Sequence, residues 1–180
     1  MERAFSLICF NHTNIPDITI KGTVSRQNNT LAIRYTLAGK IESIRLPAVS
    51  ASPARKDELW KGTCFELFLA IKDSLQYWEF NISPSGDWNV YRMEAYRRVG
   101  FQEETRIQQL PFDVQKVANG ISLLAGIDLS VLDLPEQKQE LGIAAVVRAK
   151  DGRETYWALV HPGPQPDFHL RESFILVLGE

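Results

Sequence analysis

Short runs of alternating apolar and polar side chains recur along this sequence, and turn residues separate one run from the next. Residues 17–25 place Ile18 and Ile20 on one side of an extended chain, with threonine and lysine between them on the other. Side chains of a β-strand alternate between the two faces of its sheet, so this pattern predicts a half-buried strand. Residues 27–29 form a turn signal before a second strand at 30–37, which predicts a hairpin.

The whole chain is predicted to consist of such short strands, with almost no helix. Strands are expected at residues 4–10, 17–25, 30–37, 41–46, 63–70, 76–83, 88–96, 111–116, 120–128, 140–148, 154–160 and 174–178. One short helical turn is expected at 129–134, and a proline-rich loop at 161–169. This succession favours an all-β, antiparallel β-sandwich with a single domain over residues 1–180, and a closed barrel is the alternative. The loop at 47–59 is long for a compact domain, so it is expected to flank a site.

Composition excludes several classes of protein. The 180 residues include 44% hydrophobic and 23% charged side chains, which is typical of a soluble globular domain. A net charge of −2, without a basic block, argues against a nucleic-acid partner. No run approaches the roughly 18 apolar residues of a membrane span, and the N-terminus lacks the pattern of a signal peptide. We therefore expect a cytoplasmic protein without a membrane partner; its oligomeric state stays open.

Cys9 and Cys64 are the only cysteines of the chain. Two cysteines are too few for a disulfide framework, and their spacing is not that of a metal site. Both lie in apolar runs typical of strands, where a small buried thiol is common. No zinc ligand set and no compact signature of a Ca²⁺ site is present, so no metal site is predicted.

The aromatic residues concentrate between residues 59 and 96, where three of the four tryptophans lie. Within this stretch, residues 63–70 are apolar on both faces of the predicted strand, so we expect the strand to be covered on both sides. Glu66 stands out there, because a buried carboxylate needs a partner. Arg92, two strands later, is the candidate partner of Glu66 or Glu79 through a bidentate ion pair.

The segment Trp60-Lys-Gly-Thr-Cys-Phe-Glu-Leu-Phe-Leu resembles the tryptophan-to-glutamate strand of family 9 carbohydrate-binding modules. Tyr-x-Glu-Phe-Asn-x-Ser-Pro-Ser-Gly-Asp-Trp, at 77–88, resembles bacterial proteins called DOMON-like, type 9 carbohydrate-binding-module-like. Segments 157–162 and 166–169 are also similar to these proteins, so the resemblance covers nearly the whole chain.

The resemblance implies an immunoglobulin-like or jelly-roll sandwich, whose relatives bind either sugars or haem. In the sugar-binding modules the ligand lies between two tryptophans, and charged side chains bond its hydroxyls. Carried over to this chain, Trp60 matches the first stacking residue, Glu66 the acidic one and Arg92 a basic one. Trp157 and Trp88 are the candidates for further aromatic contact, although Trp88 also fits a role in the core. Aromatic surface with ionised groups in a cleft suits a sugar, which has an apolar face and a rim of hydroxyls.

Haem binding is the first alternative, and haem would be its cofactor; otherwise no cofactor is predicted. It requires axial ligands, for which Met93 with His161 or His169 are the candidates. Met93 equally fits core packing, and the histidines equally fit a solvated loop. A protein-interaction domain is the second alternative.

Catalysis is not predicted. The segment Ser83-Pro-Ser-Gly is not the Gly-x-Ser-x-Gly of a nucleophile elbow, and no phosphate-binding glycine loop is present. Glu66 and Glu79 are conceivable paired carboxylates for glycoside hydrolysis, and their separation in space decides that question. The sequence thus favours a non-catalytic domain whose partner is a small molecule, a saccharide or a similar polyhydroxylated compound.

Overall fold

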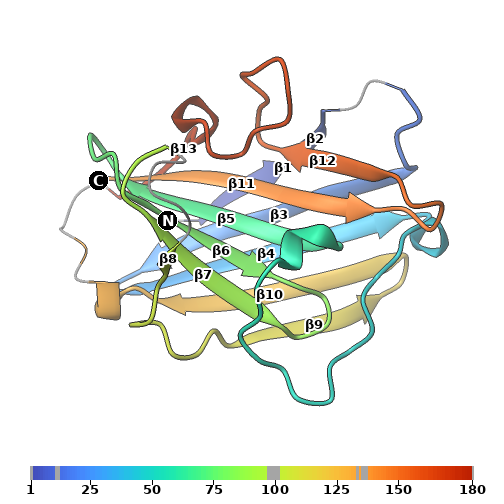
Figure 1. Ribbon diagram of the computed structural model, residues 1–180, viewed down its shortest axis with the longest axis horizontal. Coiled ribbons are helices and arrows are strands. Elements are labelled where there is room, and N and C mark those ends of the chain that lie inside the picture. The colour runs from blue at the N-terminus through green and yellow to red at the C-terminus, as the bar shows by residue number, and fades with distance from the viewer. Residues whose placement is uncertain (1, 11–12, 97–101, 133, 135–137, 180) are drawn as a thin grey trace.

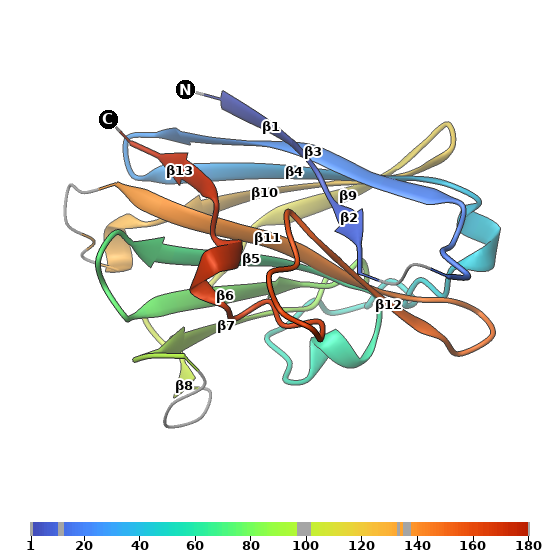
Figure 2. The ribbon, with the colours of Figure 1, turned by 90° about the horizontal axis from the view of Figure 1, so that it is seen from above.

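Two antiparallel sheets stack into one sandwich in the computed structural model, which describes residues 2–10, 13–96, 102–132, 134 and 138–179. One sheet has five strands in the order β1-β3-β4-β10-β9. The other has eight, in the order β2-β12-β11-β5-β6-β7-β8, and β13 also pairs with β11 (Figure 1). The predicted β-sandwich is confirmed. The sheets are separate layers with edges of their own, so the closed barrel is wrong (Figure 2).

The strand boundaries follow the predicted pattern closely. The five-stranded sheet contains β1 (Glu2–Ser6), β3 (Ile18–Gln27), β4 (Thr30–Gly39), β9 (Phe112–Val117) and β10 (Gly120–Asp128). The eight-stranded sheet contains β2 (Ile8–Cys9), β5 (Cys64–Ile71), β6 (Tyr77–Ile82), β7 (Trp88–Met93), β8 (Gln102–Glu103), β11 (Gln139–Arg148), β12 (Glu154–Ala158) and β13 (Leu176–Leu178). The helical elements are the short 3-10 turns η1 (Ile41–Ser43), η2 (Leu59–Lys61), η3 (Ser130–Leu132) and η4 (Arg171–Ser173). The turn expected at 129–134 is confirmed by η3, where Asp128 Oδ1 accepts a hydrogen bond from the Ser130 N–H.

Two strand predictions are wrong. Residues 41–46 begin with η1, because the Ser43 N–H and hydroxyl both donate to the Lys40 carbonyl; Ile44 alone bridges to Ala149. The strand expected at 4–10 is divided, since β1 pairs with β3 in one sheet and β2 with β12 in the other. The chain crosses from sheet to sheet at Leu7, which is buried.

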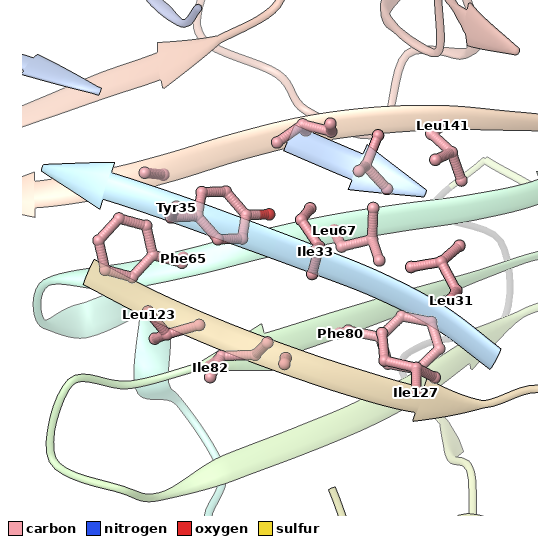
Figure 3. Packing of buried hydrophobic residues seen from close by; sticks show 14 of the residues in the cluster. Leu31, Ile33, Tyr35, Phe65, Leu67, Phe80, Ile82, Leu123, Ile127 and Leu141 are labelled. Atoms are coloured by element: carbon pink, nitrogen blue, oxygen red, sulfur yellow. The ribbon is translucent and has the colours of Figure 1, made fainter. Parts of the chain in front are cut away.

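The main core lies between the sheets. Side chains of β4, β5, β6, β10 and β11 that point inward interdigitate there, and Figure 3 labels residues from each of these strands. Tyr35, a member of this core, donates its hydroxyl to the backbone carbonyl oxygen of Glu66 at 2.8 Å, which satisfies a polar group that would otherwise destabilise the core.

A second apolar cluster covers the other face of the eight-stranded sheet. Its members, which we call the outer cluster, are Phe68, Ala70, Tyr77, Tyr91, Met93, Ala144, Ala158 and Phe174. The segment that follows β12 supplies Phe174 and lies on the side of this sheet that faces away from the five-stranded sheet (Figure 2). Phe174 approaches the sheet closely at Gly142, where any Cβ would lie 2.8 Å from its ring. Strand β5 is therefore buried on both faces, as its sequence predicts.

Candidate functional site

A cavity of about 300 Å³ opens on the outer face of the eight-stranded sheet, beside the outer cluster. It lies between that face, η2 and the loop that follows β12. The described residues that line it are Trp60, Glu66, Glu79, Val146, Tyr156, Pro166, Phe168 and His169. Four of these are aromatic rings and two are carboxylic acids, a combination suited to binding a small polar molecule with an apolar face.

Two glutamates from neighbouring strands supply the acidic groups. In the register of β5 and β6, Glu66 lies opposite Asn81 and Phe68 opposite Glu79. The two glutamates are thus diagonal neighbours on one face of the sheet. Each is only 3% exposed, so neither is an ordinary solvated surface charge.

Glu79 belongs to a network of side chains. Asn81 Nδ2 donates to Glu79 Oε1 at 2.8 Å, and His169 Nε2 lies 3.9 Å from Glu79 Oε2. On its other side, the imidazole is held by Tyr77, whose hydroxyl is 2.9 Å from His169 Nδ1. Because His169 is the last residue of the proline-rich loop, this network fixes the loop against the sheet.

Glu66 has different surroundings. Burial, and then the charge of Glu79, raises the pKa of Glu66 well above its usual range. Burial, followed by the charge of Glu66, likewise raises the pKa of the neighbouring Cys64 thiol. Among the described residues no hydrogen bond to the Glu66 carboxyl group is formed, although this group lines the cavity. Glu66 therefore holds its proton to a higher pH than an ordinary glutamate and is available to a ligand.

Aromatic rings come to the cavity from three separate segments. Trp60 belongs to η2, Tyr156 to β12, and Phe168 to the loop after β12. The Trp60 ring packs on edge against Tyr91, with centroids 5.8 Å apart, and Tyr156 and Phe168 are 6.3 Å apart. The half-buried Trp60 is thus supported from beneath by the outer cluster while it also contacts the cavity.

The loop at 47–59, expected to flank a site, does lead into η2 and Trp60. Several contacts anchor it to β7 and the turn before it. The Arg55 guanidinium lies 4.4 Å from the Trp88 ring centroid, and Lys56 Nζ pairs with Asp87 Oδ2 at 2.8 Å. Closest to Trp60, the Tyr91 hydroxyl donates to Asp57 Oδ1 at 2.5 Å. A long loop anchored in this way presents Trp60 in a fixed position.

Arg92 does not join the predicted pair with Glu66 or Glu79. Strand register places Arg92 opposite Trp78, on the face of the sheet opposite to that of both cavity glutamates. Arg92 Nε instead pairs with Glu94 Oε1 at 3.1 Å. The predicted ion pair was wrong because it matched opposite charges without determining toward which face of the sheet each side chain points.

Trp88 and Trp157 also lie away from the cavity. Both belong to the core between the sheets, where they are 8% and 5% exposed. Trp157 Nε1 donates to Thr155 Oγ1 at 2.9 Å within its own strand. Since residue 157 points inward, its neighbour Tyr156 points outward and is the β12 ring that reaches the cavity.

The three candidate haem ligands are not brought together around the cavity. Met93 is 2% exposed within the outer cluster. His161 Nε2 is 3.0 Å from the Ile8 carbonyl oxygen, and its ring packs on Phe10. Of the three, only His169 is among the described residues that line the cavity.

Sequence reasoning missed Tyr156 and Phe168, and it considered Glu79 only as a partner of Arg92 or of Glu66. Strand alternation alone contains the signal for Tyr156, because an inward Trp157 requires an outward neighbour. Phe168 lies in the loop that resembles the family, but no local pattern gives the path of a loop back over a sheet.

Other chemistry finds little support among the residues that the structure describes. They contain no group of three or more histidine, cysteine or acidic side chains placed to hold a metal ion. Ser85 Oγ donates to Asp87 Oδ2 at 2.9 Å within a turn, which is a structural contact. Nor does the described chain include a helix with the length and hydropathy needed to cross a bilayer.

Comparison with solved structures finds proteins of similar fold. No protein-family model and no curated protein matches the sequence. A protein from Bacteroides uniformis that has been proposed to bind carbohydrate is similar with a TM-score of 0.72 and 13% identity, over 96% of this chain and 84% of that one. The resemblance to family 9 carbohydrate-binding modules is thus supported by fold.

Two structures of such a module, from Caldicellulosiruptor kristjanssonii, are also similar. The complex with cellotriose has a TM-score of 0.51 and 11% identity, over 84% of this chain and 70% of that chain. The complex with glucose has a TM-score of 0.50 and 12% identity, over 84% and 72%. At these identities the comparison establishes a shared fold, so the fold expected from the sequence motifs is confirmed.

Proposed function

We propose that this protein binds a saccharide, or a similar polyhydroxylated molecule, in the outer-face cavity without transforming it. The observation that carries the proposal is the cavity itself: aromatic rings form its sides, and buried carboxylic acids lie among them. Rings contact the C–H face of a sugar, and carboxyl oxygens accept hydrogen bonds from its hydroxyls. The fold shared with sugar-binding proteins supports the same proposal.

Within this site Trp60 acts as the aromatic surface and Glu66 as the polar anchor. A cavity of about 300 Å³ is at the lower end of the size range of small-molecule sites, which suits one or two sugar rings. The anchored loop holds Trp60 in place before the ligand arrives, so little conformational freedom is lost on binding.

Calorimetric titration with a panel of mono- and disaccharides, glucose and cellobiose included, tests the proposal. We expect at least one sugar to bind, and Trp60→Ala to weaken it by more than tenfold with little change in melting temperature. Trp60→Phe retains a ring and should recover part of the affinity. Leu75→Ala, which alters an exposed apolar residue outside the cavity, is the matched control. The proposal is overturned if no sugar binds at millimolar concentration, or if Trp60→Ala binds as tightly as the wild type.

A further inference from the structure

The feature that points beyond a neutral sugar is the Glu66 carboxyl group. This side chain is 3% exposed, lines the cavity and receives no hydrogen bond from the described residues. A buried carboxyl group of this kind is destabilising unless something outside the chain satisfies it. Because Glu66 lines the cavity, a molecule that enters the cavity can supply that partner.

The acidic neighbour of Glu66 in the cavity is Glu79. Glu79, on the adjacent strand, shares the cavity, and none of the described lining residues is arginine or lysine. Arg92, the basic residue that the sequence pairs with Glu66, lies on the other face of the sheet. The nearest basic side chain along β11 on the cavity face, Arg148, pairs with Glu154 on β12. Among the described lining residues the acidic side chains thus outnumber the permanently basic ones, which favours a cationic group of a ligand over an anionic one.

The walls suit a cation as well as a sugar. Trp60, Tyr156 and Phe168 present π systems to the same space, and aromatic faces attract ammonium groups more strongly when these are desolvated. An amine bonded to Glu66 would form a charge-assisted hydrogen bond, roughly twice as strong as a neutral one. A neutral hydroxyl at the same place would gain no cation–π attraction, and its hydrogen bond to a protonated Glu66 would join two neutral groups.

We propose that the cavity prefers a saccharide that carries a free amino group, and that the ammonium binds against Glu66. This inference rests on the proposed function and names the ligand class for the same site. The sugar ring contacts the aromatic walls, while the ammonium group replaces the basic partner that Glu66 lacks among the described side chains. Before binding, the Glu66 carboxyl group and the amino group of the sugar both carry a proton that they can release. In the complex the amine remains an ammonium ion and Glu66 is a carboxylate, so the proton of Glu66 passes to the solvent.

The raised pKa of Glu66 agrees with this arrangement. Glu66 shares the cavity face of the sheet and the adjoining loop with several titratable groups. These are Cys64, Tyr77, Glu79, Tyr91, Tyr156 and His169. Burial, and then the charge of Glu79, raises the pKa of Glu66 and so favours its protonated form when the cavity is empty. A bound ammonium reverses that balance, because an opposite charge close to a carboxyl group lowers its pKa.

Matched pairs of sugars that differ by one amino group test this inference. We would titrate the protein at neutral pH with glucose and glucosamine, galactose and galactosamine, and mannose and mannosamine. At least one amino sugar should bind tenfold or more tightly than its neutral partner, and N-acetylation should remove the advantage. Calorimetry in buffers of different ionisation enthalpy should detect proton release for the amino sugar only.

The variant Glu66→Gln retains the shape of the side chain and should reduce the amine preference to less than twofold, because amino sugars then lose more affinity than neutral sugars do. Glu94→Gln removes one exposed acidic group outside the cavity and should leave the preference intact. If neutral and amino sugars bind equally well, or Glu66→Gln keeps the preference, the inference is wrong and the proposed function stands. If no member of any pair binds, both are wrong.

Discussion

Glu66 and Glu104 are both 3% exposed, yet their surroundings are opposite. Glu104 follows β8 at the edge of the main core, where Trp78 Nε1 donates to its Oε2 at 3.0 Å and Arg106 forms an ion pair with it at 2.7 Å. Glu66 lies on the outer face of the sheet, next to the acidic Glu79. One buried glutamate is thus surrounded by donors and the other by a cavity.

The pKa shifts of the two glutamates follow from this difference. Hydrogen bonds from Arg106, together with that from Trp78, outweigh burial and lower the pKa of Glu104 to about 2. Burial and a like charge raise the pKa of Glu66. A carboxylate with its own donors stabilises the fold, whereas a carboxyl group without them is retained at a cost to stability. Because the Glu66 side chain destabilises the fold and the Glu104 side chain stabilises it, we assign ligand binding to the outer face and a structural role to Glu104 at the edge of the core.

The largest change in stability is expected when the charge of Glu104 is removed. Glu104→Gln should reduce the unfolding free energy at pH 7 by about 2 kcal/mol, since it weakens hydrogen bonds to a charged group. The contribution of Glu104 is present above its ordinary pKa of 4.5 and is lost as the pH falls toward about 2. Urea denaturation of both proteins between pH 7 and pH 3 should show the difference shrinking. A difference that is constant with pH would contradict an ionic origin.

At Glu66 we expect the opposite dependence of stability on pH. Its folded-state pKa is raised, so the folded protein binds more protons than the unfolded chain, and stability falls as the pH rises above the usual range of a glutamate. Glu66→Gln removes that dependence, and its melting temperature should exceed that of the wild type by a few degrees at pH 8, as a gain of about 1 kcal/mol produces in a domain of this size. At pH 4 the two proteins should melt together. If Glu66→Gln is the less stable protein at pH 8, Glu66 has a structural partner, and the proposed difference between Glu66 and Glu104 is wrong.

Most of the fold could be predicted from sequence because strand alternation and turn residues are local signals. The hairpin of β3 and β4 and the loop that leads to Trp60 were both expected. The 3-10 turn at Ile41–Ser43 was not, since two hydrogen bonds from Ser43 to one carbonyl decide it, and the apolar pattern there is equally compatible with a strand.

The site was harder to predict, because it depends on the parity of strands that are distant in sequence. Trp60 and Glu66 line one cavity, but Arg92 and Trp157 lie on the opposite side of the sheet, and a shift of one residue exchanges the faces of a strand. The family motif identified the correct strand. The motif could not identify Phe168 as a residue that lines the cavity, because Phe168 lies in a loop whose path is fixed by tertiary contacts.

The smallest effect concerns how the outer face positions Trp60. Tyr91→Phe removes the hydroxyl that donates to Asp57 and should lower the unfolding free energy by about 1 kcal/mol, less than Glu104→Gln. Sugar affinity should fall a few-fold, because the loop before Trp60 is then less firmly held. Ser43→Ala, which removes an exposed hydroxyl bonded to Lys40, should change neither quantity measurably. A larger loss of stability from Tyr91→Phe than from Glu104→Gln would mean that the outer face is itself a structural core, and the contrast between the two buried glutamates would then no longer separate binding from folding.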